Sequence, residues 1–411
     1  MTIDRRTFLK TAAGIGAAAA LPMPFVRTAG AADTIKLAAL YDLSGGLEVS
    51  GKPMLDTLNY AVGEINAAGG LLGKQVEVVT YDTQSAMQMY GQYAQQAALK
   101  DRVAVVHGGI TSASREVIRP VLDKYKTLYF YDTPYEGGVC DRNIFCPSTT
   151  PGQTVDKLVA YALKKFGKKV YTLAANYNYG QITADWVKKY AKDGGGEVVG
   201  TEFFPLDAAD FSATISKIQA AKPDWVMAVL VGGGTISFYR QFAAAGLGGK
   251  IGVASTTFGG NGEQLVLSPK ETDGIAVCYN YMETIQNPEN AKFLDGFHKK
   301  FGAKYTPLYE LPMSSYQGVH LWAAGVRKAG STDRMAVIKA LETGIAIDMP
   351  SGKVTVDPTT HHCILNVYLA EFHDGGPKVV QDFPQQKPTD TEAVCNLKDH
   401  PNDRKQYVIK V

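Results

Sequence analysis

Apolar residues between positions 35 and 131 form two kinds of segment that alternate along the chain. Short apolar runs predict buried strands at residues 35–40, 76–81, 103–107 and 128–131. Between these runs, apolar residues recur every three or four positions, which predicts helices at residues 53–68, 89–99 and 115–125. Pro53 suits a first helical turn, and Gly69 and Gly70 mark the end of that helix. The alternation favours an α/β fold in which helices cover both faces of a parallel sheet.

The same alternation begins again after Pro151. Strands are predicted at residues 170–174, 197–203, 225–231 and 251–254, and helices at residues 155–166, 182–192, 211–220 and 236–245. A second parallel sheet of similar size is therefore expected. Further helices are predicted at residues 291–301, 316–329 and 335–341, and their periodicity assigns them to neither sheet.

The first 31 residues predict an export signal. Arg5 and Arg6 precede Thr-Phe-Leu-Lys, which is typical of a twin-arginine signal, and an alanine-rich apolar stretch follows at residues 11–21. Residues 29–31, Ala-Gly-Ala, offer the small side chains that a signal peptidase needs. The alternative is a membrane anchor, but this apolar run is too short to span a bilayer. We expect removal of the segment to leave a soluble, periplasmic protein of 380 residues.

Removal of this segment changes the charge of the protein. The segment holds four basic residues and one acidic residue, so the net charge falls from +2 to −1. A nearly neutral chain with mixed signs gives no electrostatic footprint for nucleic acid or for an anionic membrane. The remaining length exceeds that of one ordinary core and suits two domains.

The five cysteines are Cys140, Cys146, Cys278, Cys363 and Cys395, an odd number for an exported chain. Cys140 and Cys146 bracket a short turn and are one candidate pair, and a bridge between Cys363 and Cys395 is left open. The alternative is that all five are small apolar residues without a bridge. A twin-arginine signal exports folded proteins, so folding in the reducing cytosol must not depend on a disulfide.

Two loops that follow predicted strands carry candidate binding residues, because ligands of parallel sheets bind beyond the carboxyl ends of the strands. Residues 108–114 are small and open a helix, where Ser112 adds a hydroxyl to exposed backbone N–H groups. The alternative is that Ser112 or Ser114 merely caps that helix. Residues 131–137 place Thr133 among aromatic side chains, which suits a small polar ligand.

At these loops the sequence resembles the periplasmic binding proteins of hydrophobic amino acid and amide uptake transporters. The resemblance covers the mature chain, through the stretches at residues 42–45, 66–73 and 350–352. The most discriminating stretches resemble the amide- and urea-binding branch: residues 133–137, 142–145, 318–322 and 328–333, with the pair His361-His362.

The resemblance implies a type I periplasmic binding protein fold, with two Rossmann-like lobes joined by three hinge crossings. The first lobe would hold residues 33–149 and 281–346, and the second lobe residues 150–280 and 347–411. Such a protein closes around a small polar ligand, an amide, urea or amino acid, and delivers it to permease subunits in the inner membrane. We expect a monomer without cofactor or metal, and ATP hydrolysis in other subunits, since this chain has no phosphate-binding loop.

By matching position, the resemblance also implies which residues hold the ligand. These are Ser112, Tyr131 and Thr133 on the first lobe and Tyr177, Gly232, Gly233, Thr256 and Thr257 on the second. Ile110 and Asp132 depart from the amide-binding branch and are candidates for setting specificity. Asp132 would either pair with an amino group of the ligand or be a solvated turn residue.

The sequence offers three alternatives to a function in amide or urea binding. Branched-chain or other amino acid binding fits the same family. An enzyme is disfavoured, because the seven histidines show no metal-binding helical spacing and no Gly-X-Ser-X-Gly turn occurs. His361 and His362 are adjacent and would point to opposite faces of a strand, which disfavours a shared metal. A ligand-sensing regulator of the same fold is disfavoured by the export signal.

Overall fold

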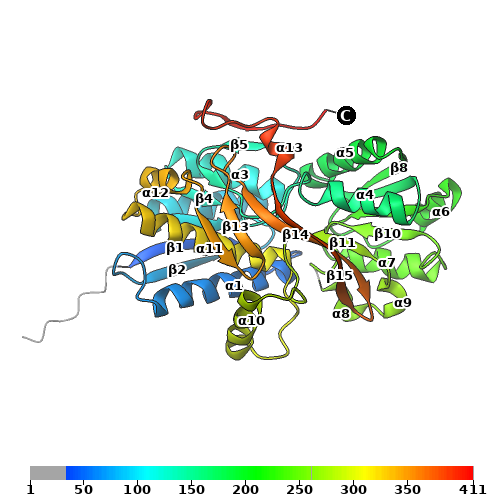
Figure 1. Cartoon of the computed structure of the whole chain (residues 1–411), viewed down its shortest axis with the longest axis horizontal. Helices are drawn as coiled ribbons and strands as arrows, with labels where there is room; N and C mark the ends of the chain where they lie inside the picture. Colours follow the sequence, from blue (N-terminus) through cyan, green and yellow to red (C-terminus); the bar gives the residue numbers. More distant parts are fainter. Residues whose placement is uncertain (1–33, 261, 411) are drawn as a thin grey trace, which may run out of the picture. The chain divides into compact units, whose positions relative to one another are not determined.

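The computed structural model describes residues 34–260 and 262–410, so the predicted export signal lies outside the described residues (Figure 1). The first sheet has strand order β2-β1-β3-β4-β6, and all its pairings are parallel. Its strands are β1 (Ile35–Tyr41), β2 (Val76–Asp82), β3 (Val105–Gly108), β4 (Leu128–Phe130) and β6 (Ile144–Phe145). Residues 37–41 of β1 are fully buried on both faces, as expected for a strand covered by helices on each side.

Five helices belong with this first sheet and form the first lobe. They are α1 (Glu48–Ala67), α2 (Met87–Gln96), α3 (Ser112–Lys124), α11 (Glu310–Ala329) and α12 (Arg334–Leu341). A π-helical turn, Ala97–Asp101, extends α2, and α10 (Pro288–Phe301) precedes α11. The helices at the end of the chain, which periodicity could not assign, therefore pack on the first lobe through the contact of α11 with α1 and β3.

The second sheet begins with five parallel strands in the order β8-β7-β9-β10-β11. These are β7 (Lys169–Ala175), β8 (Glu197–Phe204), β9 (Trp225–Val229), β10 (Gly252–Ser255) and β11 (Ala276–Tyr279). The helices of this lobe are α4 (Val155–Lys165), α5 (Asn178–Asp193), α6 (Ser212–Ala221), α7 (Gly234–Ala244), α8 (Glu263–Val266) and α9 (Pro269–Thr272). The prediction of an α/β fold with two parallel sheets is confirmed.

The second sheet continues into an antiparallel part that the sequence pattern did not reveal, so the sheets are not of similar size. Its strands are β12 (Ala346–Met349), β13 (Gly352–Val356), β14 (Cys363–His373) and β15 (Gly376–Gln386). β15 is exposed along most of its length, so it lacks the kind of apolar run from which strands are predicted. The chain passes between the lobes three times, after β6, after β11 and along β12 to β14.

The first helix begins at Glu48, five residues before the predicted start at Pro53. Pro53 therefore lies inside α1, where it removes one backbone hydrogen bond. The first turn of α1 packs closely against the end of β1, because a Cβ atom on Gly51 would lie 2.0 Å from the carbonyl oxygen of Asp42. Glycine at residue 51 thus permits a contact that no other residue type allows.

The C-terminal segment returns to the first lobe after β15 and the short helix α13 (Thr389–Glu392). Strand β16 (Arg404–Gln406) pairs antiparallel with β5 (Val139–Asp141), and a disulfide joins Cys140 to Cys395. Both candidate pairs, Cys140 with Cys146 and Cys363 with Cys395, are therefore wrong, and Cys146 and Cys363 are free and buried. The two bonded cysteines are 255 residues apart in sequence, and the pairing of β16 with β5 brings their segments together. The lobe boundaries themselves stay a prediction.

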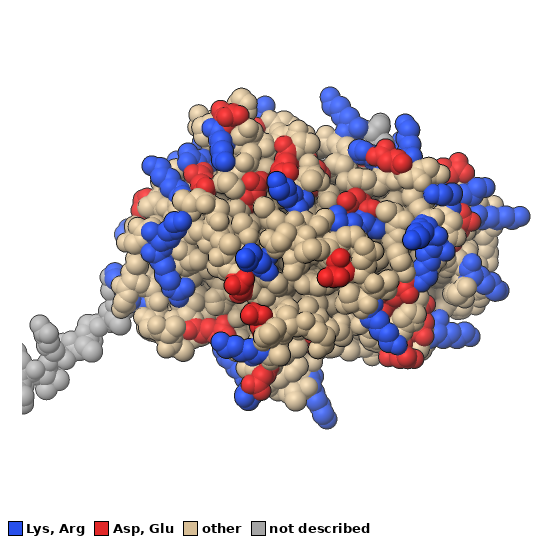
Figure 2. Space-filling view, in the orientation of Figure 1, with Lys and Arg blue, Asp and Glu red and all other residues tan. Residues whose placement is uncertain are grey.

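The surface view in Figure 2 shows lysine and arginine side chains interspersed with aspartate and glutamate over the displayed face. Such mixing agrees with the expectation from the nearly neutral net charge. Among the described residues, no helix has the length and apolar character needed to cross a membrane.

Candidate ligand-binding site

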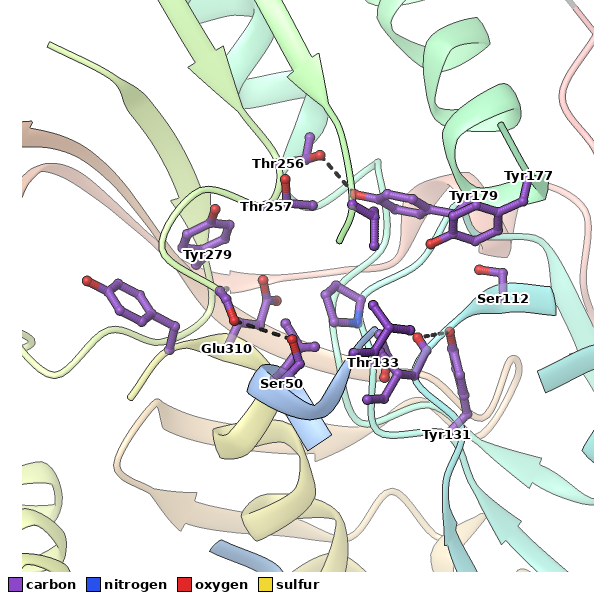
Figure 3. A pocket seen from close by; sticks show the side chains of 17 residues that line it. Ser50, Ser112, Tyr131, Thr133, Tyr177, Tyr179, Thr256, Thr257, Tyr279 and Glu310 are labelled. Carbon is purple, nitrogen blue, oxygen red and sulfur yellow. Dashed lines mark hydrogen bonds between the residues drawn. The ribbon is translucent and has the colours of Figure 1, made fainter. Parts of the chain in front are cut away.

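A cavity lies between the two lobes, at the carboxyl ends of strands from both sheets (Figure 3). Seven of the ten residues singled out from the sequence line it: Ile110, Ser112, Tyr131, Thr133, Tyr177, Thr256 and Thr257. They follow β3, β4, β7 and β10, which is where the binding rule for parallel sheets placed them.

Gly232, Gly233 and Asp132 do not line this cavity. Gly232 follows the cavity residue Val231 and adopts a φ of +90°, and a Cβ atom there would lie 2.6 Å from the carbonyl oxygen of Leu206. Glycine at this position therefore lets the loop after β9 turn.

Asp132 is fully buried in the first lobe, so its interpretation as a solvated turn residue is wrong. Its Oδ2 atom accepts a hydrogen bond from the Tyr41 hydroxyl at 2.9 Å and lies 3.0 Å from Nδ1 of His107. Burial raises the pKa of Asp132, and the nearby His107 opposes this shift. A Cβ atom on Gly318 would lie 2.5 Å from Oδ1 of Asp132, so α11 can approach this carboxyl only through a glycine.

On the first-lobe wall, three hydroxyl groups each donate a hydrogen bond to an oxygen atom of the protein. Tyr131 donates to the carbonyl of Ile110 at 3.1 Å, and Thr133 donates to the carbonyl of Gly109 at 3.2 Å. Ser112 donates to Oε2 of Glu136 at 2.5 Å. Carbonyl and carboxylate oxygens have no proton to give, so each hydroxyl has used its only hydrogen and keeps its lone pairs.

Helix α3 is capped by Thr111, whose side chain accepts from the backbone N–H of Ser114 at 3.1 Å. Neither Ser112 nor Ser114 is the cap, so that alternative is wrong. Because a helix leaves its first N–H groups without internal partners, the start of α3 at Ser112 brings backbone donors to the cavity wall.

On the second-lobe wall too, hydroxyl groups donate their hydrogens to oxygen atoms of the protein. Thr257 donates to the carbonyl of Leu230 at 2.7 Å, and Tyr279 donates to the carbonyl of Phe258 at 2.9 Å. The hydroxyls of Tyr179 and Thr256 lie 2.8 Å apart and bond to each other (Figure 3). Burial raises the pKa of Tyr179, so its phenol stays protonated at neutral pH.

Glu310 is the one ionisable carboxyl among the described lining residues, and none of those side chains is a lysine, arginine or histidine. It is the first residue of α11, is only 3% exposed, and accepts from the Thr149 hydroxyl at 2.5 Å. Burial raises the pKa of Glu310 to about 7, against the opposing hydrogen bond from Thr149. The carboxyl therefore titrates in the neutral range, well above an ordinary glutamate.

Sequence reasoning missed ten lining residues. They are Leu47, Ser50, Pro134, Tyr179, Val231, Gly260, Tyr279, Tyr309, Glu310 and Leu311. Some of them neighbour a predicted residue and could have been found by widening each loop. Leu47 ends the loop after β1 and Ser50 lies in the first turn of α1, so a search of that loop could have reached Leu47. Residues 309–311 stand at the start of α11, which follows α10 and not a strand, so the rule does not point to them.

The two adjacent histidines have separate partners. Nε2 of His361 lies 3.1 Å from Oε1 of Glu342, whereas Nε2 of His362 lies 2.5 Å from the Tyr135 hydroxyl. Burial lowers the pKa of His362 to about 4, so that ring is neutral at physiological pH. The part of the chain that the structure describes holds no group of three or more His, Cys, Asp or Glu residues placed to bind a metal ion.

Two family models match the sequence. Residues 34–377 match the family described as periplasmic binding protein. Residues 2–22 match the twin-arginine translocation pathway signal sequence, which confirms the predicted export signal.

Among individual proteins, the Leu/Ile/Val-binding protein homolog 6 of Brucella melitensis is 25% identical over 367 residues, which cover 86% of this chain and 93% of the relative. An ABC transporter solute-binding protein of R. palustris, solved in complex with 4-hydroxybenzoate, has a TM-score of 0.77 and 25% identity. That match covers 87% of this chain and 98% of the other.

An amino acid ABC transporter substrate-binding protein of Pseudomonas fluorescens has a TM-score of 0.78 at 20% identity, and the match covers 90% of this chain and all of the other. At that identity the likeness concerns the fold alone.

Proposed function

The chain belongs to the periplasmic binding protein family, and from that premise we propose that its cleft captures a small uncharged amide or urea. It is an exported, periplasmic protein that serves as the solute-binding component of an ABC transporter for small ligands, and it is not an enzyme.

The observation that carries the proposal is the direction of the hydroxyl hydrogen bonds. Three hydroxyls of the first lobe and two of the second donate to carbonyl or carboxylate oxygens. Their lone pairs remain as acceptors, so the side chains favour a ligand rich in N–H donors. Urea has four N–H groups and a primary amide has two, whereas a carboxylic acid offers none once ionised.

The same wall supplies donors for one carbonyl oxygen. The first N–H groups of α3 lie at Ser112, and a helix N-terminus favours an oxygen that carries partial negative charge. No basic side chain is among the described lining residues, so a full carboxylate would lack a cationic partner there. A neutral amide or urea meets both requirements without a buried ion.

Capture by closure of the two lobes follows from the fact that both lobes contribute hydroxyl groups to the cavity. Ser112, Tyr131 and Thr133 belong to the first lobe, and Thr257 and Tyr279 belong to the second. A ligand bound by both sets makes contacts in the closed state that the open state lacks. Only such a difference in affinity shifts the equilibrium towards closure, which the permease would then recognise.

A thermal-shift panel of urea, acetamide, leucine and 4-hydroxybenzoate against the purified mature protein tests the ligand class. A true ligand at one hundred times its Kd should add about 2.7 kcal/mol of stability. We expect urea or acetamide to raise the melting temperature. A rise with leucine or 4-hydroxybenzoate alone would overturn the amide proposal.

Glu310 favours a second candidate, an amino acid whose ammonium group pairs with this carboxyl. In that case affinity should rise as pH increases through about 7, since Glu310 ionises over that range. Calorimetric titration with leucine and with acetamide at pH 6 and pH 8 distinguishes the two ligands, because ionisation of Glu310 strengthens binding of an ammonium group far more than binding of a neutral amide.

A further inference from the structure

Glu136 does not line the cavity, yet it contacts a cavity residue, the opposite lobe and the C-terminal segment. It lies in the loop after β4 and is only 1% exposed. Its side-chain oxygens and its backbone oxygen have separate partners, which define three directions of contact.

Towards the cavity, Oε2 of Glu136 accepts the Ser112 hydroxyl at 2.5 Å. This bond fixes the position of the Ser112 hydroxyl hydrogen. The lone pairs of the Ser112 hydroxyl oxygen are then left to accept hydrogen bonds from other groups. Nη2 of Arg115 donates to Oε1 at 2.9 Å, and neither side chain of this ion pair is exposed. The guanidinium lies 5.0 Å from the ring of Tyr131, so the pair also supports an aromatic wall of the cavity.

Towards the second lobe, Glu136 accepts two hydrogen bonds from α5. The Trp186 indole N–H donates to its backbone oxygen at 3.0 Å, and Nδ2 of Asn178 donates to Oε1 at 3.4 Å. Helix α5 packs on β7 and β8 of the second sheet, whereas the loop of Glu136 follows β4 of the first sheet. These bonds therefore exist only when the two lobes are brought together as they are here.

Towards the C-terminal segment, Nε2 of Gln406 donates to Oε1 of Glu136. Gln406 ends β16, which pairs with β5, and the disulfide at Cys140 fastens the same strand. The C-terminal segment thus contacts the loop of Glu136 independently of the cavity and of α5.

We propose that Glu136 is a positioning residue that couples the orientation of the Ser112 hydroxyl to closure of the second lobe. A ligand that donates a hydrogen bond to Ser112 binds a hydroxyl oxygen whose orientation is already fixed. The carboxylate of Glu136, which fixes it, also stabilises the closed arrangement through α5. The choice of urea or acetamide as probe rests on the proposed function, but the coupling between Ser112 and α5 does not.

A double-mutant cycle with Glu136→Gln and Ser112→Ala tests the first half of the coupling. An amide in place of the carboxylate can donate to Ser112 and reverse its hydroxyl, so Glu136→Gln should weaken binding of urea or acetamide at least about tenfold. In the Ser112→Ala background the same change should cost clearly less, because the oxygen that Glu136 orients is gone and only its contribution through α5 remains. An equal loss in both backgrounds would show a merely structural role.

The variants Asn178→Ala and Trp186→Phe test the second half and leave the buried ion pair intact, should Glu136→Gln fail to fold. Each removes one hydrogen bond to Glu136, so each should weaken binding about fivefold. Gln181→Ala is the matched control, since Gln181 lies exposed on the same helix and bonds to Asn176 within the second lobe. It should bind as the wild type does.

Scattering from the ligand-free proteins provides a readout that does not depend on the ligand. Both α5 variants should increase the radius of gyration relative to the wild type and to Gln181→Ala, because the closed arrangement loses support. Unchanged radii together with unchanged affinities would overturn the inference. Failure of every probe to bind the wild type would refute the ligand class alone, and the scattering comparison would still decide the role of Glu136.

Discussion

At the scale of single residues, the protein keeps several carboxyl groups away from water. Glu310 is the one that faces the cavity, and burial raises its pKa to about 7. An unfolded glutamate titrates near 4.3, so the folded protein holds a proton that the unfolded chain releases between these values. Position 310 therefore adds a pH-dependent contribution to stability as well as a polar group to the cavity.

Glu310→Gln should remove this contribution. Since the folded pKa is raised, the wild type loses stability as pH rises from about 4.5 towards 7, and the loss is complete above the folded value. From pH 5 to pH 8 the free energy of unfolding of the wild type should fall by roughly 2 to 3 kcal/mol relative to Glu310→Gln. Calorimetric thermal unfolding at the two pH values, in the absence of urea, measures the difference. Parallel pH profiles for the two proteins would contradict the assignment.

Two helical glycines provide a matched pair for steric fit. A Cβ atom on Gly318 would lie 2.5 Å from a buried oxygen of Asp132, whereas one on Gly63 would meet only the flexible end of Lys300 at 3.5 Å. Gly318→Ala should therefore destabilise the protein by about 1 to 3 kcal/mol. Gly63→Ala should stabilise it by up to about 1 kcal/mol through helix propensity. Calorimetric thermal unfolding of both variants, in the absence of urea, measures the contrast, and a stabilised Gly318→Ala protein would argue against close packing at Asp132.

At the scale of elements, α3 links the fold to the site. Its N-cap is Thr111 and its first residue is Ser112, so the capping bond and the cavity hydroxyl belong to one turn of chain. The hydrogen bond from the backbone N–H of Ser114 to the Thr111 side chain fixes the direction in which the helix begins. Loss of the cap would affect both helix stability and the donors presented at the cavity.

Thr111→Val keeps the shape of the side chain and removes its acceptor oxygen. Stability should fall by about 1 kcal/mol, as for other N-caps. The affinity for urea or acetamide should fall as well, because the first turn of α3 frays. Thermal unfolding and calorimetric titration check the two effects, with Ser212→Ala, at the exposed start of α6, as a control that should leave affinity unchanged. A Thr111→Val protein as stable as the wild type would show that the cap contributes nothing.

At the scale of the whole molecule, the C-terminal segment ties the end of the chain to the first lobe. Cys395 and Leu397 form a small buried cluster with Cys140, away from the main cores under the sheets. A twin-arginine signal exports folded protein, so this bridge would close after the cores have formed. The disulfide should therefore stabilise the finished protein without being needed for folding.

Replacing both cysteines by serine tests this reading. The variant Cys140→Ser/Cys395→Ser should fold but lose about 2 to 4 kcal/mol of unfolding free energy. Dithiothreitol should lower the stability of the wild type to the same level and leave the double variant unchanged. Calorimetric thermal unfolding with and without reductant, in the absence of urea, measures both effects. An aggregated, unfolded variant would show instead that the bridge is required for folding.

Local sequence was enough for features that depend on neighbouring residues. Alternating apolar runs and helical periods located the strands of both parallel parts except β6 and β11. The loops after four of these strands supplied seven cavity residues, because strand and helix patterns repeat over a few residues. The export signal could be predicted because it, too, is a pattern of neighbouring residues. Tertiary structure alone decided that Glu310 faces the cavity, that Asp132 is buried beside His107, and that Cys140 pairs with Cys395. These contacts join segments far apart in the chain, and their energies depend on packing and desolvation that exist only once both lobes have folded.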